Sequence, residues 1–592
     1  MRSGTGRRFT ELALAAAVVV VAGAAAPGPA AARQVDLGRR FLVVARSDAT
    51  FNGLRSDIVA AGGRIVNEMP DIGTFVVTGP TTLTSLSSDA NASGVAADHL
   101  EALSPPESGK LTLHAPLGTK NGGGHATGTP DPAFGLPGLM WNVDRIDAPQ
   151  AWKTTTGSKA VTVGVADTGL DYTNSELKTQ VAGVVDFTGL EGTPTICDQV
   201  NGPGSNDSDM ATLYGGPANT DWNGHGSWIG GNIAAALDGA GINGIAPSVK
   251  LVALKISQWC GYAYDSEILA AFTYAADHDI DVVSISFGGY LDRTDPDQNL
   301  MYQQYVKTVK YAMQKGTLIV AAAGNEHVRV GADGRVLSHG SETVPGDAVA
   351  DYYGMYETPG GIPGVVDVSS TGNVVNSTSK SCPPSAVDIG GNPTCKSRSD
   401  AHQPAGIGLQ NQLAYYSNYG PRIDLAAPGG ARMFNLPVWD GGGTPGFPYT
   451  ASTAAFEDFS ITSDWALQIP CFIGSSLGPQ FYPNACYSTI QGTSMATPHV
   501  SAVAALIASR YPSLRHQPLA IKTVLLGTAT HVWGNTTQPL SARDTSPGDF
   551  GSYALVACTT GYCHNGGAPI SDAEAYGAGL VNAAAAVNAF GH

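Results

Sequence analysis

After Trp141 the chain alternates short, uninterrupted apolar runs with longer stretches of helical periodicity. The predicted strands are Val161–Ala166, Leu251–Ile256, Val282–Ile285 and Leu318–Ala322, and the predicted helices are Asp265–Ala276 and Tyr302–Lys315. Apolar strands that do not alternate with polar residues and are separated by helices are typical of a parallel sheet buried on both faces. The pattern predicts an α/β fold, in which ligands bind at the carboxyl ends of the strands.

A smaller unit with a different pattern precedes this fold. Residues 33–105 predict a strand over 40–45, a helix from Ser56 to Ala61, strands over 64–66 and 73–77, and then a weak helix, which together suit a small α+β domain. Residues 106–134 have the Pro- and Gly-rich composition of an exposed linker, where we expect maturation cleavage. Residues 135–592 form the large domain, with loop insertions predicted near 371–412 and 431–490.

The first 32 residues have the layout of a secretory signal peptide. Arg2, Arg7 and Arg8 precede an apolar stretch over 12–26, and three alanines over 30–32 form the exit. We expect cleavage after residue 32 and a secreted, extracellular protein. A membrane anchor is the alternative, but the apolar stretch is shorter than the roughly 20 residues that span a bilayer.

Eight cysteines agree with export, because an even number at short spacings is typical of disulfides formed outside the cell. Proximity in sequence favours the pairs Cys382–Cys395, Cys471–Cys486 and Cys558–Cys563, which leaves Cys197 and Cys260 for each other. Many other connectivities are compatible with the sequence. Cys558, Cys563 and His564 also resemble part of a metal site, although no second pair of ligands is near.

Charge narrows the classes of partner. The 592-residue chain has 14% charged residues, a net charge of −17 and no basic run. Nucleic-acid binders need a basic face to meet phosphates, and anionic membrane surfaces attract basic segments. We therefore expect no nucleic-acid or membrane partner, and a monomer.

Four polar segments lie where the predicted sheet would place a site: Ala166–Gly169, Asn223–Ser227, Ala321–Glu326 and Gly492–His499. Asp167 and Asn325 follow the ends of apolar strands, and His225 stands between glycines. Ser494 opens a segment of helical period, where free N–H groups and the positive end of the helix dipole meet. Each segment alone has an ordinary structural explanation as a turn, a core histidine or a helix cap.

Together the four segments supply the parts of a nucleophilic hydrolase. A serine hydroxyl needs a neighbouring base to take its proton, and that base needs a carboxylate that fixes its tautomer. The oxyanion that forms then needs donors aimed at it. Asp167, His225 and Ser494 are the candidate triad, and Asn325 is the candidate oxyanion donor.

In this order the segments resemble those of the subtilisin family of serine endopeptidases, the subtilases. Further matching segments are Gly244–Pro247, Ser417–Gly420, Ala427–Gly429 and Tyr576–Asn582. The resemblance covers about residues 141–592 and implies a subtilisin-like three-layer fold that cleaves proteins or peptides. Residues 33–105 resemble, less specifically, the ferredoxin-like inhibitory propeptide of the family. The chain would then be a self-processing zymogen whose own propeptide is an intramolecular inhibitor.

The resemblance also implies roles for substrate-binding residues, which are Ser286, Phe287, Gly288, Ala322, Ala323 and Gly324. The first three would pair with the substrate backbone, with Phe287 where the family usually has Leu. The last three would line the pocket for the side chain before the scissile bond. Because they are small, we expect a wide, mostly apolar pocket that favours Phe, Tyr, Leu or Met, tolerates Lys near Glu326 and rejects acidic side chains.

A structural calcium ion is implied as well, although no cofactor is expected for catalysis. Asn174–Leu177 replaces the family's usual His-Pro-Asp-Leu run, so that Glu176 stands where an Asp often binds calcium. Asp238 lies in the loop Ala236–Ile242, which matches the family's calcium loop in length. Both carboxylates are oxygen ligands of the kind Ca²⁺ prefers. Two solvated acids are the alternative.

Two other functions fit parts of the sequence. Gly474–Gly478 matches the G-x-S-x-G elbow of lipases and esterases with Ser476 as nucleophile, but Pro479 and Pro483 interrupt the helix that should follow. A catalytically inactive binding protein on the same fold is the third candidate, which the presence of all four active-site residue types disfavours. A fluorophosphonate probe separates the three functions by labelling Ser494, Ser476 or neither.

Overall fold

The computed structural model describes residues 40–103, 108–109, 140–192, 194–338, 351–372, 413–414, 416–430, 461–467, 486–531 and 570–591. The predicted signal peptide, Ser476, His564, and most of the linker and of the two insertions lie outside the described residues. Within them, no helix is both long and apolar enough to cross a membrane.

The N-terminal domain, residues 40–97, is a four-stranded antiparallel sheet with helix α2 (Phe51–Ala60) packed against it. The strand order is β2 (Arg64–Met69), β3 (Thr74–Thr78), β1 (Arg40–Ala45), β4 (Ala92–Ala97). The weak helix predicted after the third strand is the 3₁₀ helix Thr81–Ser88. This is the predicted ferredoxin-like order. Strand β4 escaped prediction because its Ala- and Ser-rich residues form no apolar run.

The large domain is built on a seven-stranded parallel sheet, which confirms the predicted architecture. Its strand order is β16 (Leu425–Pro428), β15 (Val366–Thr371), β13 (Leu318–Ala322), β11 (Val282–Ile285), β7 (Thr162–Asp167), β9 (Lys250–Lys255), β8 (Val181–Asp186). All four strands predicted from apolar runs are present, two of them with the predicted bounds.

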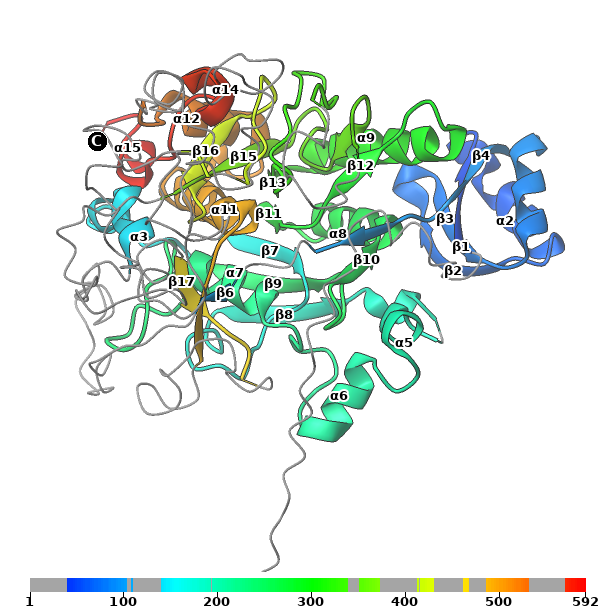
Figure 1. Ribbon diagram of the computed structural model, residues 1–592, viewed down its shortest axis with the longest axis horizontal. Coiled ribbons are helices and arrows are strands. Elements are labelled where there is room, and N and C mark those ends of the chain that lie inside the picture. Colours follow the sequence, from blue (N-terminus) through cyan, green and yellow to red (C-terminus); the bar gives the residue numbers. More distant parts are fainter. Residues whose placement is uncertain are drawn as a thin grey trace, which may run out of the picture.

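Helices cover both faces of this sheet and complete three layers (Figure 1). On one face lie α7 (His225–Ala234) and α11 (Thr493–Arg510), and on the other lie α8 (Asp265–Asp277) and α9 (Pro296–Lys315). Successive strand residues serve the two layers in turn: Leu318 and Val320 pack with α11, whereas Ile319 packs with α9. Helix α9 begins six residues before the predicted start, because Asp295 caps it through the N–H groups of Asp297 and Gln298.

Short strands surround the carboxyl ends of the sheet. Strand β10 (Tyr262–Tyr264) pairs with β5 (Leu100–Ala102), β12 (Gly289–Leu291) pairs with β14 (Tyr356–Thr358), and β18 (Tyr487–Ile490) lies between β17 (Ile461–Asp464) and β6 (Ser108–Gly109). The remaining helices are α3 (Trp141–Arg145), α4 (Ala148–Ala151), α5 (Ile196–Asn201), α6 (Asp207–Tyr214), α12 (Pro518–Gly527), α14 (Asp572–Tyr576) and α15 (Ala583–Val587).

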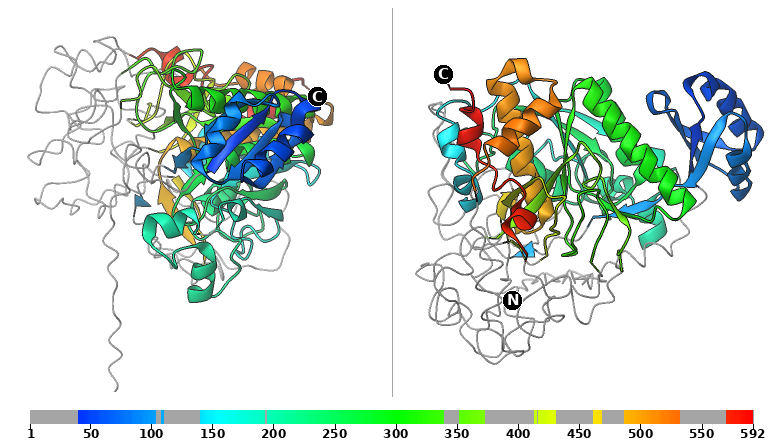
Figure 2. Two further views of the ribbon diagram at one scale, coloured as in Figure 1. Left: turned by 90° about the vertical axis from the view of Figure 1, so that its right-hand side faces the viewer. Right: turned by 90° about the horizontal axis from the view of Figure 1, so that it is seen from above.

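The N-terminal domain sits against α8 and α9, away from the C-terminal helices (Figures 1 and 2). Its side chains Leu42, Ile72 and Val76 belong to the same hydrophobic cluster as these two helices. Arg40 crosses the boundary: it pairs with Asp98 at 2.6 Å and donates to the hydroxyl of Ser266 at 2.8 Å, at the start of α8. The domain therefore docks through apolar burial fixed in register by charged hydrogen bonds.

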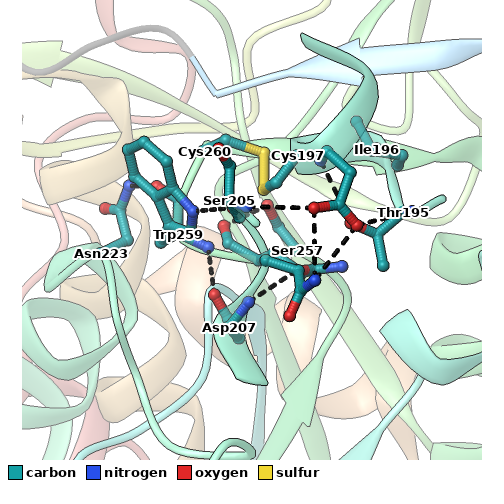
Figure 3. The surroundings of a disulfide bond; sticks show 12 residues. Thr195, Ile196, Cys197, Ser205, Asp207, Asn223, Ser257, Trp259 and Cys260 are labelled. Carbon is teal, nitrogen blue, oxygen red and sulfur yellow. Dashed lines mark hydrogen bonds between the residues drawn. A yellow bond between two sulfur atoms is a disulfide. The ribbon is translucent and has the colours of Figure 1, made fainter. Parts of the chain in front are cut away.

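A disulfide joins Cys197 in α5 to Cys260, just before β10, as predicted (Figure 3). It ties the α5–α6 segment to the edge strand that pairs with β5. Beside it, Trp259 accepts a hydrogen bond at its carbonyl from Asn223, two residues before His225, at 2.7 Å. Cys486 is also disulfide-bonded. Its predicted partner Cys471 and the cysteines of the other two predicted pairs lie outside the described residues.

Candidate active site

Asp167 and His225 form a buried hydrogen-bonded pair at the carboxyl end of β7, an interior strand of the sheet. Asp167 is the last residue of β7, and His225 is the first residue of α7. The Nδ1 atom of His225 lies 2.8 Å from Oδ1 of Asp167, and the two residues are 0% and 1% exposed. Among the described residues, Nε2 of His225 has no hydrogen-bond partner. A carboxylate on Nδ1 keeps the proton there, so that Nε2 can accept another.

The loop that carries His225 is organised by Asp221, which the sequence did not single out. Its carboxylate accepts from the Thr168 hydroxyl at 2.9 Å and from the N–H groups of Asn223, Gly224 and Ser227 at 2.8–2.9 Å. The hydroxyl of Thr168 accepts in turn from the N–H of Gly226 at 3.0 Å. A Cβ on Gly226 would lie 2.0 Å from the carbonyl oxygen of Gly169, so only glycine allows this approach of helix and strand.

Beneath the same loop, Lys255 is a second polar residue that the sequence did not reveal. It is fully buried at the end of β9, pairs with Asp207 at 2.7 Å and donates to the carbonyl of Thr168, next to Asp167. An ammonium that joins the α6 segment to the end of β7 fixes the backbone on which the Asp167–His225 pair is built.

Ser494 is the second residue of α11, which packs against the sheet over almost its whole length. Its N–H is one of the first four of the helix, which have no carbonyl partner within the helix. The hydroxyl donates to the carbonyl of Ser286 at 3.5 Å. His499, one turn along, is held by Met495 and Asn142, and burial lowers its pKa to about 3, so it is a neutral structural residue.

Asn325 is oriented toward Ser494 by Thr493, the residue that precedes the serine. Its Oδ1 accepts from the N–H of Thr493 at 2.9 Å and from the Thr493 hydroxyl at 2.8 Å. An amide whose oxygen is held in this way presents its two N–H donors on the other side. Asn325 and Ser494 line the same cleft, so the carboxamide and the start of the helix converge.

The cleft brings together all six predicted substrate-binding residues. It is lined by Ala102, Ser286, Phe287, Gly288, Gly289, Tyr290, Ala322, Ala323, Gly324, Asn325, Glu326, Glu357, Thr358, Thr493 and Ser494. The prediction of a mostly apolar pocket is wrong, because Glu357 and Tyr290 line it together with Glu326. Glu357 gave no signal in the sequence: it lies on the three-residue strand β14, far from every motif.

At the acidic end of the cleft, burial raises the pKa values of the carboxyl groups. Burial, followed by the neighbouring Asp367 carboxylate, raises the pKa of Glu357 well above its usual value. Burial also raises the pKa of Asp367 to about 7, against the lowering effect of Arg422. Burial raises the pKa of Glu326 as well, although the Tyr290 hydroxyl donates to its carboxylate at 2.7 Å.

The chain itself approaches the cleft from two sides. Strand β5 pairs antiparallel with β10, the N–H of Leu103 donates to the carbonyl of Gly261 at 2.7 Å, and Ala102 lines the cleft. On the other side, β6 pairs with the end of β18, two residues before Gly492. Two pieces of the segment that follows the N-terminal domain, 100–102 and 108–109, therefore pair as strands with the large domain.

The two predicted calcium ligands lie away from the cleft. Glu176 is fully buried, and its Oε1 accepts from the N–H of Ile242 at 3.1 Å and from the hydroxyl of Tyr487 at 2.6 Å. Asp238 lies in the loop that Ile242 ends. Across the described part of the chain, no group of three or more His, Cys, Asp or Glu side chains is arranged to hold a metal ion.

Comparison with known proteins places these residues in a family context. Residues 158–556 match the sequence model of the subtilase family. Thermitase of Thermoactinomyces vulgaris is 25% identical over 405 residues, which cover 68% of this chain and 94% of thermitase. Fervidolysin of Fervidobacterium pennivorans is 25% identical over 411 residues, which cover 68% of this chain and 42% of fervidolysin.

Solved structures resemble the fold at lower identity. The epidermin leader peptide processing serine protease of Staphylococcus aureus has a TM-score of 0.55 at 17% identity, with 93% of this chain and 98% of that chain covered. The crystal structure of fervidolysin has a TM-score of 0.52 at 20% identity, with 93% and 61% covered.

Proposed function

This chain belongs to the subtilase family of serine endopeptidases, and we propose that it hydrolyses peptide bonds with Ser494, His225 and Asp167 as its triad. The observation that carries the proposal is the buried 2.8 Å hydrogen bond between Asp167 at the end of β7 and His225 at the start of α7, since α11, which carries Ser494, packs against both elements. In a parallel α/β fold, residues that are far apart in the sequence meet at the carboxyl ends of the strands, which is where Asp167 lies.

In the proposed reaction, the hydroxyl oxygen of Ser494 attacks the carbonyl carbon of the scissile bond while its proton passes to Nε2 of His225. Asp167 stabilises the imidazolium through the Nδ1–H. The oxyanion accepts from the carboxamide of Asn325 and the N–H of Ser494. His225 then returns the proton to the leaving amine, the peptide C–N bond breaks, and water hydrolyses the acyl-enzyme by the same steps in reverse roles.

We further propose that residues 33–105 are an inhibitory propeptide that the enzyme removes from itself. Support comes from strand β5, which occupies the edge of β10 as an extended substrate would, with Ala102 in the cleft. Because Ala102 lines the same cleft as Ser494, we place the cleaved bond after Leu103, near the start of the predicted 106–134 linker. A product that stays bound in this way blocks the cleft until its domain unfolds or is cleaved.

Secretion is part of the proposal, since the signal-like residues 1–32 and the Cys197–Cys260 disulfide both favour an oxidising compartment. A structural calcium ion is proposed near Glu176 and Asp238. The chemistry of the site supports it: Asp464 is fully buried, and burial together with Glu176 and Asp171 raises its pKa well above the usual value. A hard cation would stabilise buried carboxylates that repel one another in this way.

The function is tested with purified protein and two readouts. We expect a fluorophosphonate probe to label Ser494 and a serine-directed inhibitor to stop the degradation of casein. N-terminal sequencing of the mature chain should place the cut after Leu103 and before the large domain. Label on Ser476, or none, would assign the chain to one of the two other functions.

A further inference from the structure

One end of the cleft is closed by the β12–β14 ribbon, and it is acidic. Tyr290 and Glu357 are directly opposite each other in this antiparallel pair, so their side chains project from the same face. Both line the cleft together with Ser494. The carbonyl oxygen of Thr358 lies 2.4 Å from the position that a Cβ on Gly288 would take, which fixes the ribbon tightly against the substrate-binding segment.

The two carboxylates in the cleft differ in how they are satisfied. Glu326 accepts from the Tyr290 hydroxyl at 2.7 Å and from the carboxamide of Asn418 at 3.4 Å. Glu357 is only 3% exposed, yet neither of its oxygens has a hydrogen-bond partner in the described part of the chain. An ionised carboxylate buried without donors is costly, so Glu357 is complete only when a donor enters the cleft.

The nearby cations are committed elsewhere. Arg422 donates to Asp424 at 2.8 Å and to the carbonyl groups of the loop that follows β14, and Lys522 donates to Asp424 at 2.8 Å. A second carboxylate, Asp367, faces Glu357: a Cβ on Gly360 would lie 2.6 Å from Oε1 of Glu357 and 2.9 Å from Oδ1 of Asp367. This end of the cleft therefore has buried carboxyl groups without a cation committed to them.

We propose that Glu357 binds the cationic side chain of the substrate residue before the scissile bond, with arginine preferred over lysine. A guanidinium brings a full positive charge and five donors, enough for Glu357 and for the acceptors around it. An apolar side chain of the same length would bury Glu357 further and give it no partner. This specificity rests on the proposed peptidase activity and names its substrate class.

The decisive experiment compares peptides that differ only at that residue, with arginine, lysine, norleucine or phenylalanine. Norleucine is the matched control, because it has an unbranched side chain without charge. For the wild-type enzyme we expect kcat/KM for arginine to exceed that for norleucine by about 10²–10³-fold. In Glu357→Gln this advantage should be lost because kcat/KM for the arginine peptide falls. The kcat/KM for the norleucine peptide should change by less than about threefold.

Asp333→Asn controls for the general loss of one negative charge. Asp333 is exposed on the adjoining turn, outside the cleft, and its substitution should leave the arginine-to-norleucine ratio unchanged. A wild-type preference for phenylalanine or norleucine overturns the proposal. So does a Glu357→Gln enzyme that keeps the preference for arginine.

A binding measurement separates this proposal from the peptidase function itself. The fluorescence of p-aminobenzamidine, an aryl cation, reports binding without turnover, and its Kd should rise about 10²-fold in Glu357→Gln. If no peptide is cleaved and no probe labels Ser494, the peptidase function fails, while the amidine titration still tests the cleft. An equal Kd in the wild type and Glu357→Gln refutes the cation site whatever the activity.

Discussion

In the loop that carries His225, Asp221 receives four hydrogen bonds, whereas Glu357, which lines the cleft, receives none from the described residues. Both side chains are buried, at 0% and 3% exposure. The donors of Asp221 come from the strand end and the helix start that carry the Asp167–His225 pair, so its charge is used to hold the catalytic backbone still. The oxygens of Glu357 instead have no donors among the described residues, and the side chain lines the cleft.

The difference teaches how to assign a role to a buried acid. A carboxylate whose oxygens are filled by backbone N–H groups stabilises the fold, and its removal leaves donors without acceptors. A carboxylate without donors destabilises the fold and is explained by a ligand. The loop that holds the Asp167–His225 pair is built before substrate arrives, whereas the acidic end of the cleft is completed by substrate.

The largest effect expected at the catalytic end is that of Ser494→Ala. Turnover should fall on the order of 10⁶-fold, as when the nucleophile of subtilisin is removed, and the precursor should stay unprocessed. Ser501→Ala is the matched control, because Ser501 is buried on the same helix and donates only to the carbonyl of Thr497. Normal maturation of isolated Ser494→Ala would contradict self-processing.

Asn325→Ala should lower kcat by about 10²–10³-fold with little change in KM, because its carboxamide is placed to bind the oxyanion and not the ground-state substrate. Steady-state kinetics on one peptide decide between these parameters. A comparable rise in KM with unchanged kcat would show that Asn325 positions substrate.

Asp221→Asn and Glu357→Gln should act in opposite directions on stability. The first puts an NH₂ group against backbone donors and should lower the free energy of unfolding by about 3 kcal/mol. The second removes a buried carboxyl group that has no hydrogen-bond partner among the described residues, and should leave that free energy unchanged or raise it. Guanidinium unfolding of the inhibited enzymes measures the free energy of unfolding of both variants. Equal losses in the two variants would contradict the distinction between Asp221 and Glu357.

Removing calcium should lower the melting temperature if an ion binds near Glu176. A ligand bound only by the folded state stabilises it by about 2.7 kcal/mol at a hundredfold excess over its Kd. Differential scanning calorimetry with and without a chelator provides the measurement, with Glu176→Gln as the variant that should no longer respond. A wild-type melting temperature that ignores the chelator would remove calcium from the proposal.

The smallest effect is a dependence of stability on pH at the acidic end, where Asp367, Glu326 and Arg422 surround Glu357. A carboxyl group whose folded-state pKa is raised stabilises the protein while protonated, and this contribution is lost as pH rises through the raised value. From the ordinary carboxyl range up to about pH 7, where Asp367 titrates, the wild type should lose stability relative to Glu357→Gln. Melting curves of the two proteins at several pH values across this range test the prediction. Melting temperatures that change equally with pH in both proteins would contradict it.

Much of the architecture follows from local pattern. The strands Val282–Ile285 and Leu318–Ala322 were predicted with their observed bounds, because strands buried on both faces must be apolar throughout. Helix α9 was predicted too short, since its first turn is set by the Asp295 cap and carries no apolar period. The order of the four segments was enough to predict a site containing Asp167, His225, Asn325 and Ser494.

The sequence by itself determined which residues carry reactive chemistry and which strands deliver them, because glycine-flanked His225 and helix-opening Ser494 are local features that neighbouring residues define. Only the tertiary structure decided the roles of Asp221, Lys255 and Glu357. Each is an acid or a lysine without a motif, and its meaning depends on which donors or acceptors other segments bring to it. Hydrogen-bond satisfaction is a property of contacts between residues far apart in the chain, and no pattern along one segment records it.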